Sequence, residues 1–143
     1  MLSYKDYLLD TCILLHLIRD SPLCRRIVDT YELTGGLTNC AICVVTVGEI
    51  YAIARRRNWG TQKISIMDTL LSKIERINID YDEVLEAYAE IDYVLRSQQM
   101  GKNDMWIAAV AKVTGFTLLT TDRAFGLLYG KQISGEWIDP NTR

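Results

Sequence analysis

The sequence predicts an α/β protein with three layers, α/β/α, and a mainly parallel central sheet. Short apolar runs of strand length alternate with segments whose apolar residues recur at helical spacing. This alternation is typical of parallel sheets that are covered by helices on both faces. The 143 residues are 49% hydrophobic and 24% charged, as in one soluble domain. Because no linker or repeat divides the chain, we expect a single domain over residues 1–143.

The first half of the chain is expected to hold two strands separated by helices. Residues 7–9 predict a short strand that stops at Asp10, and residues 11–19 predict a helix that ends near Ser21-Pro22. The elements expected next are a helix over 25–33 closed by Gly35-Gly36, a buried strand over 40–45, and a helix over 47–57 ended by Asn58 and Gly60. The residues Thr46-Val47-Gly48-Glu49 predict a capping box at the start of that last helix.

The second half continues the alternation. Residues 62–72 have helical spacing, and residues 74–79 alternate apolar and polar side chains as a half-buried strand does. The elements expected next are a helix over 82–99 stopped by Gly101, a helix over 104–114, a strand over 117–121, a short helix over 123–129 and an edge strand over 136–138. Such sheets bind their ligands outside the carboxyl ends of the strands, which is therefore where a site is expected.

Charge, apolar runs and cysteines limit the classes of function. The formal net charge of −2 provides no overall positive field, so a nucleic acid would be held by local basic residues or through cations. The longest early apolar run, 12–18, is far short of the roughly 20 residues that cross a bilayer, and no signal-peptide pattern is present. We therefore expect a cytoplasmic protein with no membrane partner. The four cysteines are expected to be reduced thiols, since Cys40 and Cys43 would point to opposite faces of a strand.

Four carboxylates are expected to meet at the carboxyl edge of the sheet. Asp10 and Asp122 each end a predicted strand, and Glu49 lies one turn into the helix after the strand over 40–45. The helix over 104–114 would be about 16 Å long and the following strand about 17 Å. Because only two residues connect them, the helix must run antiparallel to the strand, which brings Asp104 beside Asp122.

Each carboxylate alone can also be explained by helix capping. Asp10, Asp104 and Asp122 stand where helix starts favour Asp, and Glu49 would complete the capping box. Capping does not account for their convergence, because neighbouring carboxylates repel and raise one another's pKa unless a cation neutralises them. Oxygen ligands without a His/Cys cluster favour Mg²⁺ or Mn²⁺ over Zn²⁺. Metals held in this way can activate water for attack on phosphorus.

Four segments of the sequence occur in the order and spacing of the PIN domain. They are Leu8-Leu9-Asp10-Thr11, Val45-Thr46-Val47-Gly48-Glu49-Ile50, Gly101-Lys102-Asn103-Asp104-Met105-Trp106-Ile107-Ala108-Ala109 and Leu118-Leu119-Thr120-Thr121-Asp122. The match extends from near the N-terminus to about Phe125, and the chain resembles the small VapC-type toxin ribonucleases in particular. This resemblance implies a PIN-like nuclease domain and a metal-dependent endoribonuclease that leaves 5′-phosphate and 3′-hydroxyl ends.

The resemblance also implies roles for individual residues and partners. The catalytic metal ligands would be Asp10, Glu49, Asp104 and Asp122. Thr11 and Thr121 would be supporting hydroxyls that orient a carboxylate or water. PIN toxins are commonly homodimers inhibited by a small antitoxin that lays a peptide over the acidic groove. The expected partners are therefore RNA, a cognate antitoxin and a second copy of the chain.

Three basic residues are candidates to hold RNA phosphates. Arg56 lies seven residues after Glu49, on the same helix face and about 10 Å away, and Lys102 and Arg123 flank two of the acids. Arginine binds phosphate well, but basic residues at a helix end also complement its dipole in solvent, so both interpretations stay open. His16, the only histidine, lies among leucines, which disfavours a ribonuclease with paired histidines.

Two classes of function follow from these patterns. The first is an RNA phosphodiesterase, the toxin of a type II toxin-antitoxin pair. The alternative is a non-catalytic binding module, whose acidic groove binds a cation or a basic peptide and whose fold serves RNA or protein binding. A receiver-type phospho-acceptor domain also places Asp at strand ends, but no Lys follows residues 136–138 as that class requires.

Overall fold

A five-stranded parallel sheet forms the centre of the structure. The structure is a computed structural model, and it describes residues 5–33, 38–96, 98 and 100–141. The strands are β1 (Lys5–Leu9), β2 (Thr38–Cys43), β3 (Glu75–Ile77), β4 (Thr117–Thr120) and β5 (Ser134–Trp137), in the spatial order β3-β2-β1-β4-β5. Leu8 of central β1 pairs with Ala41 of β2 and with Leu118 of β4. Because every described pairing is parallel, the carboxyl ends of the strands share one edge.

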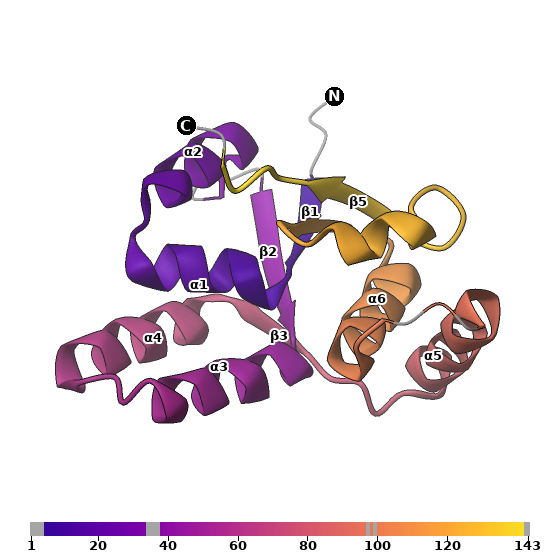
Figure 1. Cartoon of the computed structure of the whole chain (residues 1–143), viewed down its shortest axis with the longest axis horizontal. Coiled ribbons are helices and arrows are strands. Elements are labelled where there is room, and N and C mark those ends of the chain that lie inside the picture. The colour runs from indigo at the N-terminus through magenta and orange to yellow at the C-terminus, as the bar shows by residue number, and fades with distance from the viewer. Residues whose placement is uncertain (1–4, 34–37, 97, 99, 142–143) are drawn as a thin grey trace.

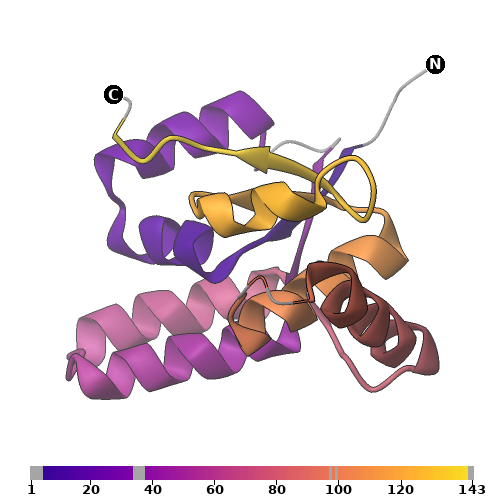
Figure 2. The same cartoon turned by 45° about the vertical axis from the view of Figure 1, so that its right-hand side comes forward.

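Helices cover both faces of this sheet, which confirms the predicted three-layer fold (Figure 1). They are α1 (Thr11–Arg19), α2 (Pro22–Tyr31), α3 (Val44–Arg56), α4 (Thr61–Lys73), α5 (Asp82–Leu95), α6 (Lys102–Thr114) and the 3-10 helix η1 (Arg123–Leu128). Helices α3 and α4 lie side by side as an antiparallel pair in both views (Figures 1 and 2). None of the helices in the described part of the chain has the length and apolar character that a bilayer crossing needs.

The two-residue period of the strands divides the core into two clusters. Leu8 and Leu118 pack with α5, α6 and η1, whereas Leu9 and Leu119 pack with α1, α2, α3 and α4. All four leucines are at most 1% exposed. Asp10 and Thr120 come two positions after Leu8 and Leu118, so their side chains lie on the same side of the sheet, which is the side covered by α6. The strand register therefore decides which side chains emerge beneath α6 at the carboxyl edge.

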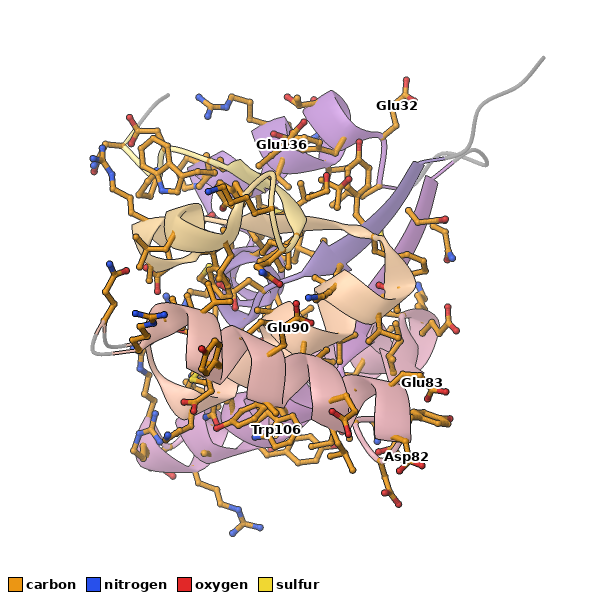
Figure 3. The ribbon with its side chains drawn as sticks, turned by 90° about the vertical axis from the view of Figure 1, so that its right-hand side faces the viewer. Glu32, Asp82, Glu83, Glu90, Trp106 and Glu136 are labelled. Carbon is orange, nitrogen blue, oxygen red and sulfur yellow. The ribbon has the colours of Figure 1, made fainter. Side chains whose placement is uncertain are left out.

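Aromatic and ionic contacts hold α6 against α5; Trp106 and Glu90, one partner of each contact, are labelled in Figure 3. The ring of Trp106 stacks on Tyr88 with 4.0 Å between ring centroids and 25° between the planes. Further along the helix, Lys112 Nζ lies 2.6 Å from Glu90 Oε2. Asp104 precedes Trp106 by two residues, so this packing positions the turn that carries the carboxylate.

Helices α2 and α3 each begin three residues earlier than the sequence predicts. Helix α2 begins at Pro22 instead of residue 25, because Ser21 caps it by accepting a hydrogen bond from the backbone N–H of Cys24 at 3.2 Å. Helix α3 begins at Val44, directly after β2, and Cys43 is its N-cap. The predicted capping box at residues 46–49 is therefore wrong, since these residues lie inside the helix. The expected closure of α2 by Gly35-Gly36 lies outside the described residues.

Two other elements are shorter than predicted. Helix α5 ends at Leu95 and not at residue 99, because Arg96 adopts the positive φ of 52°. The strand expected over residues 74–79 is limited to Glu75–Ile77. The predicted edge strand over residues 136–138 is found as β5, at the edge of the sheet and parallel to β4.

We expect Gly115→Ala to lower the free energy of unfolding by about 1 to 2 kcal/mol, because Gly115 ends α6 at φ 73°, where an L side chain is strained. Urea unfolding followed by circular dichroism measures the change. Gly126→Ala is the control, since Gly126 lies in η1 without a positive φ and an added Cβ there meets nothing within 4 Å. Equal stability of the two variants would contradict the expectation.

Candidate active site

The four carboxylates singled out in the sequence come from four separate elements. Asp10 follows β1, Glu49 lies in the second turn of α3, Asp104 is the third residue of α6, and Asp122 follows β4. Asp10 is only 4% exposed, Glu49 and Asp104 are half-buried, and Asp122 is exposed. The exposure of the four carboxylates to solvent therefore increases from Asp10, which is buried at the carboxyl edge, to Asp122, which lies at the surface.

The charges of these four residues act on one another at Asp104. Burial raises the pKa of Asp104 from 3.8 to about 7, together with the negative charges of Asp10, Asp122 and Glu49. Such a shift is the behaviour of carboxylates that share one site, and it is commonest at functional sites. Near neutral pH the site therefore carries negative charge that a proton or a cation would neutralise.

Asp10 is held by uncharged donors. The backbone N–H of Thr11 donates to Asp10 Oδ1 at 2.8 Å, and Thr120 Oγ1 and Cys12 Sγ donate to Oδ2 at 2.7 and 3.2 Å. Burial raises the pKa of Asp10, and these hydrogen bonds lower it in part. The backbone N–H of Asp10 donates to Leu119 O at 3.0 Å, which extends the pairing of β1 with β4 by one residue. Both the backbone and the carboxylate of Asp10 are thus oriented by the neighbouring strand.

Glu49 is held by Thr11, one of the two predicted supporting hydroxyls. Thr11 Oγ1 donates to Glu49 Oε1 at 2.7 Å and lies 3.1 Å from Thr46 Oγ1. These contacts join the start of α1 to α3. Thr46 is fully buried, although its position in the sequence indicated only a capping role. The three-residue spacing from Thr46 to Glu49 could have identified it, because residues three apart share a helix face.

The hydroxyl on β4 that supports Asp10 belongs to Thr120, whereas the family resemblance pointed to Thr121. Thr120 is fully buried, donates to Asp10 Oδ2 and accepts a hydrogen bond from Asp122 N–H at 2.9 Å. Thr121 instead contacts Cys12, to whose Sγ its backbone N–H donates at 3.3 Å. The two-residue period could have shown this, because Thr120 shares the strand face of Leu118.

The basic candidates lie around the acidic edge. Exposed Arg56 shares a groove of about 490 Å³ with Glu49 and Asn103. Lys102 is exposed at the first turn of α6. The guanidinium of Arg123 lies 4.5 Å from the centroid of the Trp137 ring, directly after Asp122 in the chain. The three positions provide positive charge on α3, α6 and η1.

His16 and the pair Cys40 and Cys43 lie outside the hydrogen bonds described for the acidic site, whereas Cys12 donates to Asp10. His16 Nδ1 lies 2.7 Å from Ser21 Oγ, and burial lowers the pKa of its imidazole. All four cysteines are free thiols. Cys43 packs in the α6-side cluster and Cys40 against the opposite one, so the pair points to opposite faces as predicted.

The donor set fits a hard divalent cation, but it is not arranged around one. Among residues 5–33, 38–96, 98 and 100–141, no three His, Cys, Asp or Glu side chains are placed to hold a metal ion as they stand. Asp10 and Glu49 are bonded to hydroxyls instead. All four acids nevertheless offer only oxygen, which Mg²⁺ and Mn²⁺ prefer. The raised pKa of Asp104 shows that their charge is not neutralised within the protein.

Fold and site together define an α/β protein with an acidic site at the carboxyl edge of a parallel sheet. The family model described as the PIN domain matches residues 7–131. The chain therefore belongs to the PIN domain family. No curated protein matches the chain significantly.

Several solved structures share this fold. VapBC2 from Rickettsia felis, bound to a DNA fragment from its promoter, has a TM-score of 0.81 and 24% identity over 94% of this chain and 99% of that chain. VapBC-1 from nontypeable Haemophilus influenzae has a TM-score of 0.75 and 20% identity over 92% and 97%. VapBC-5 from Mycobacterium tuberculosis, of the VapBC family of toxin-antitoxin systems, has a TM-score of 0.64 and 23% identity over 93% and 97%. At these identities the similarity establishes the fold.

We expect Thr120→Val to lower the free energy of unfolding by about 1 to 3 kcal/mol. The change preserves shape, but it removes a donor to the buried carboxylate of Asp10 and an acceptor for Asp122 N–H. Urea unfolding at pH 8 measures the loss. Thr117→Val on the same strand is the control, because that hydroxyl lies at the surface, 3.3 Å from Ser134 Oγ. A loss at Thr117 as large as that at Thr120 would contradict the assigned role.

The pKa of Asp104 predicts a pH dependence of stability in the absence of metal. The native state holds this proton up to pH about 7, whereas the unfolded carboxyl loses it near pH 3.8. The contribution of Asp104 to stability is therefore lost progressively as pH rises from about 3.8 to about 7. In EDTA, Asp104→Asn should match the wild type most closely near pH 4 and be more stable at pH 8, as measured by urea unfolding.

Asp68→Asn is the control for this pH series, because Asp68 is exposed on α4. We expect the Asp68 variant to follow the wild type at both pH values. If Asp104→Asn also follows the wild type, Asp104 does not titrate in the way described.

Proposed function

We propose that this protein is a Mg²⁺- or Mn²⁺-dependent endoribonuclease and the toxin of a type II toxin-antitoxin pair. One observation carries the proposal: burial, together with the negative charges of Asp10, Asp122 and Glu49, raises the pKa of Asp104 to about 7. The site lies at the carboxyl edge of a parallel sheet, where α/β proteins bind their ligands. Membership of the PIN domain family supports a nuclease.

The four acids would hold the cation, which supplies charge neutralisation at phosphorus and activation of water. Thr11 and Thr120 orient the carboxylates of Glu49 and Asp10 through their hydroxyls. Hydrolysis would break the bond between phosphorus and the 3′ oxygen, and that oxygen would leave with a proton. The products would be a 5′-phosphate and a 3′-hydroxyl.

The basic residues around the edge would bind the RNA backbone. Arg56 is placed to hold a phosphate in the groove that it shares with Glu49. Lys102 and Arg123 would hold phosphates on the α6 and η1 sides. The acidic edge repels RNA, so these residues and the cation together would offset that repulsion.

The structural neighbours support the toxin role and a protein partner. Chains of VapBC assemblies from several bacteria share this fold over most of their length. As the resemblance to VapC-type toxins implies, the partner would be a small antitoxin that lays a peptide over the acidic groove. The toxin would also form a homodimer.

A non-catalytic binding module is the second candidate. The observation in its favour is that Asp10 and Glu49 are bonded to Thr120 and Thr11 and that the described residues do not form a ready metal site. In that case the acidic groove would bind a basic peptide and the fold would serve RNA or protein binding. Activity measurements separate the two candidates.

We expect the triple variant Asp10→Asn, Asp104→Asn and Asp122→Asn to cleave RNA at least about a hundredfold more slowly than the wild type. Asn caps helices about as well as Asp but lacks the charge that a cation requires. Cleavage of a single-stranded RNA is measured with Mg²⁺, with Mn²⁺ and with EDTA, and the product ends are mapped. The wild type should lose activity in EDTA.

Asp68→Asn is again the matched control, because it removes one carboxylate from the exposed face of α4. This variant should cleave as the wild type does. Cleavage that survives in the triple variant would rule out the proposed chemistry and favour the binding module. The toxin role further requires that expression of the wild type, but not of the triple variant, arrests bacterial growth.

A further inference from the structure

Tyr129 carries a buried hydroxyl for which the fold supplies no partner. The residue follows η1, and its side chain packs in the α6-side cluster. Within the described part of the chain, Tyr129 Oη is buried and accepts or donates no hydrogen bond. Buried hydroxyls without a partner are rare in native structures, and each one calls for an explanation such as water or a ligand.

The neighbouring strand accommodates the ring through a glycine. A Cβ added to Gly135 would overlap Cε1 of Tyr129 and lie 2.9 Å from its Cδ1. Only glycine therefore lets the ring lie this close to β5. Gly135 pairs with Leu118 of β4, and two residues further along β4 is Thr120, whose hydroxyl binds Asp10. The ring of Tyr129 thus lies beside the face of β4 that carries Leu118 and Thr120, and Thr120 belongs to the acidic site.

The electrostatic surroundings of the hydroxyl are those of the acidic site. Burial raises the pKa of Tyr129, and the charges of Asp10 and Asp122 raise it further. At neutral pH the phenol therefore keeps its proton and can only help the site as a neutral donor. The carboxylates whose charges act on the hydroxyl are those of Asp10 and Asp122.

We propose that Tyr129 is a positioning residue of the acidic site, whose hydroxyl donates a hydrogen bond to a water held between it and the carboxylates of Asp10 and Asp122. A buried water typically makes about three hydrogen bonds. It would accept one from the unpartnered phenol and donate to the two carboxylates, whose oxygens each accept more than one hydrogen bond. The inference rests on the proposed cation site, because the water would orient these carboxylates for cation binding.

The test compares Mn²⁺ binding by the wild type, Tyr129→Phe and Tyr88→Phe in isothermal titration calorimetry. Tyr129→Phe removes only the hydroxyl, and it should weaken Mn²⁺ binding roughly tenfold, as the loss of outer partners of metal ligands does. Tyr88 belongs to the same cluster but stacks on Trp106, so its variant should bind Mn²⁺ as the wild type does. In EDTA, the Tm of Tyr129→Phe should stay within about 2 °C of the wild type, because the hydroxyl bonds to no described residue.

Unchanged affinity in Tyr129→Phe overturns the proposal. A loss of affinity that Tyr88→Phe shares, or one accompanied by a fall in Tm of more than about 5 °C in EDTA, also overturns it, since the hydroxyl would then serve the fold. If the wild type itself binds no Mn²⁺ at millimolar concentration, the cation site fails and this inference fails with it. If the wild type and Tyr129→Phe bind Mn²⁺ equally well, the role of Tyr129 is excluded, but the proposed cation site stands.

Discussion

The burial of Asp10 constrains the arrangement of the strands around it. A carboxylate that is 4% exposed requires hydrogen-bond donors, because an uncompensated buried charge costs several kcal/mol. One donor is the backbone of Thr11, and another is the hydroxyl of Thr120 on the neighbouring strand. Thr120 can reach Asp10 only if β1 and β4 are adjacent, parallel and level at their carboxyl ends. The bond from Asp10 N–H to Leu119 O fixes that register.

The two layers of helices then bring the other acids to the same edge. Helix α3 packs on one face of the sheet through Val47 and Ile50, and α6 packs on the other. The two helices also contact each other, so Glu49 and Asp104 approach Asp10 from opposite layers. No single element could place these charges together. The favourable free energy of packing the whole core offsets the repulsion among these carboxylates.

The sequence was sufficient for the fold but only partly sufficient for the site. Apolar periodicity reports burial, so it predicted the order of elements and the parallel sheet. Helix starts were less accurate, because Val44 continues directly from β2 and no side-chain cap marks the boundary. The hydrogen bond from Thr120 to Asp10 was not predicted, because it depends on the strand face, which a shift of one residue reverses. Tyr129 could not have been found, because its relation to Gly135 depends on the pairing of β5 with β4.

The uncharged character of the donors explains why the site keeps its negative charge. Thr11, Thr120 and Cys12 orient the carboxylates without neutralising them. A Lys or Arg paired with Asp104 would lower the pKa of its carboxyl, yet burial and the neighbouring acids raise it. Basic residues instead stand at the rim, as Arg56 does in the groove with Glu49. Hydroxyl donors can be exchanged for a cation at little electrostatic cost, whereas an internal ion pair would have to be broken first. A site built in this way can bind a cation from solution without first breaking an ion pair within the protein.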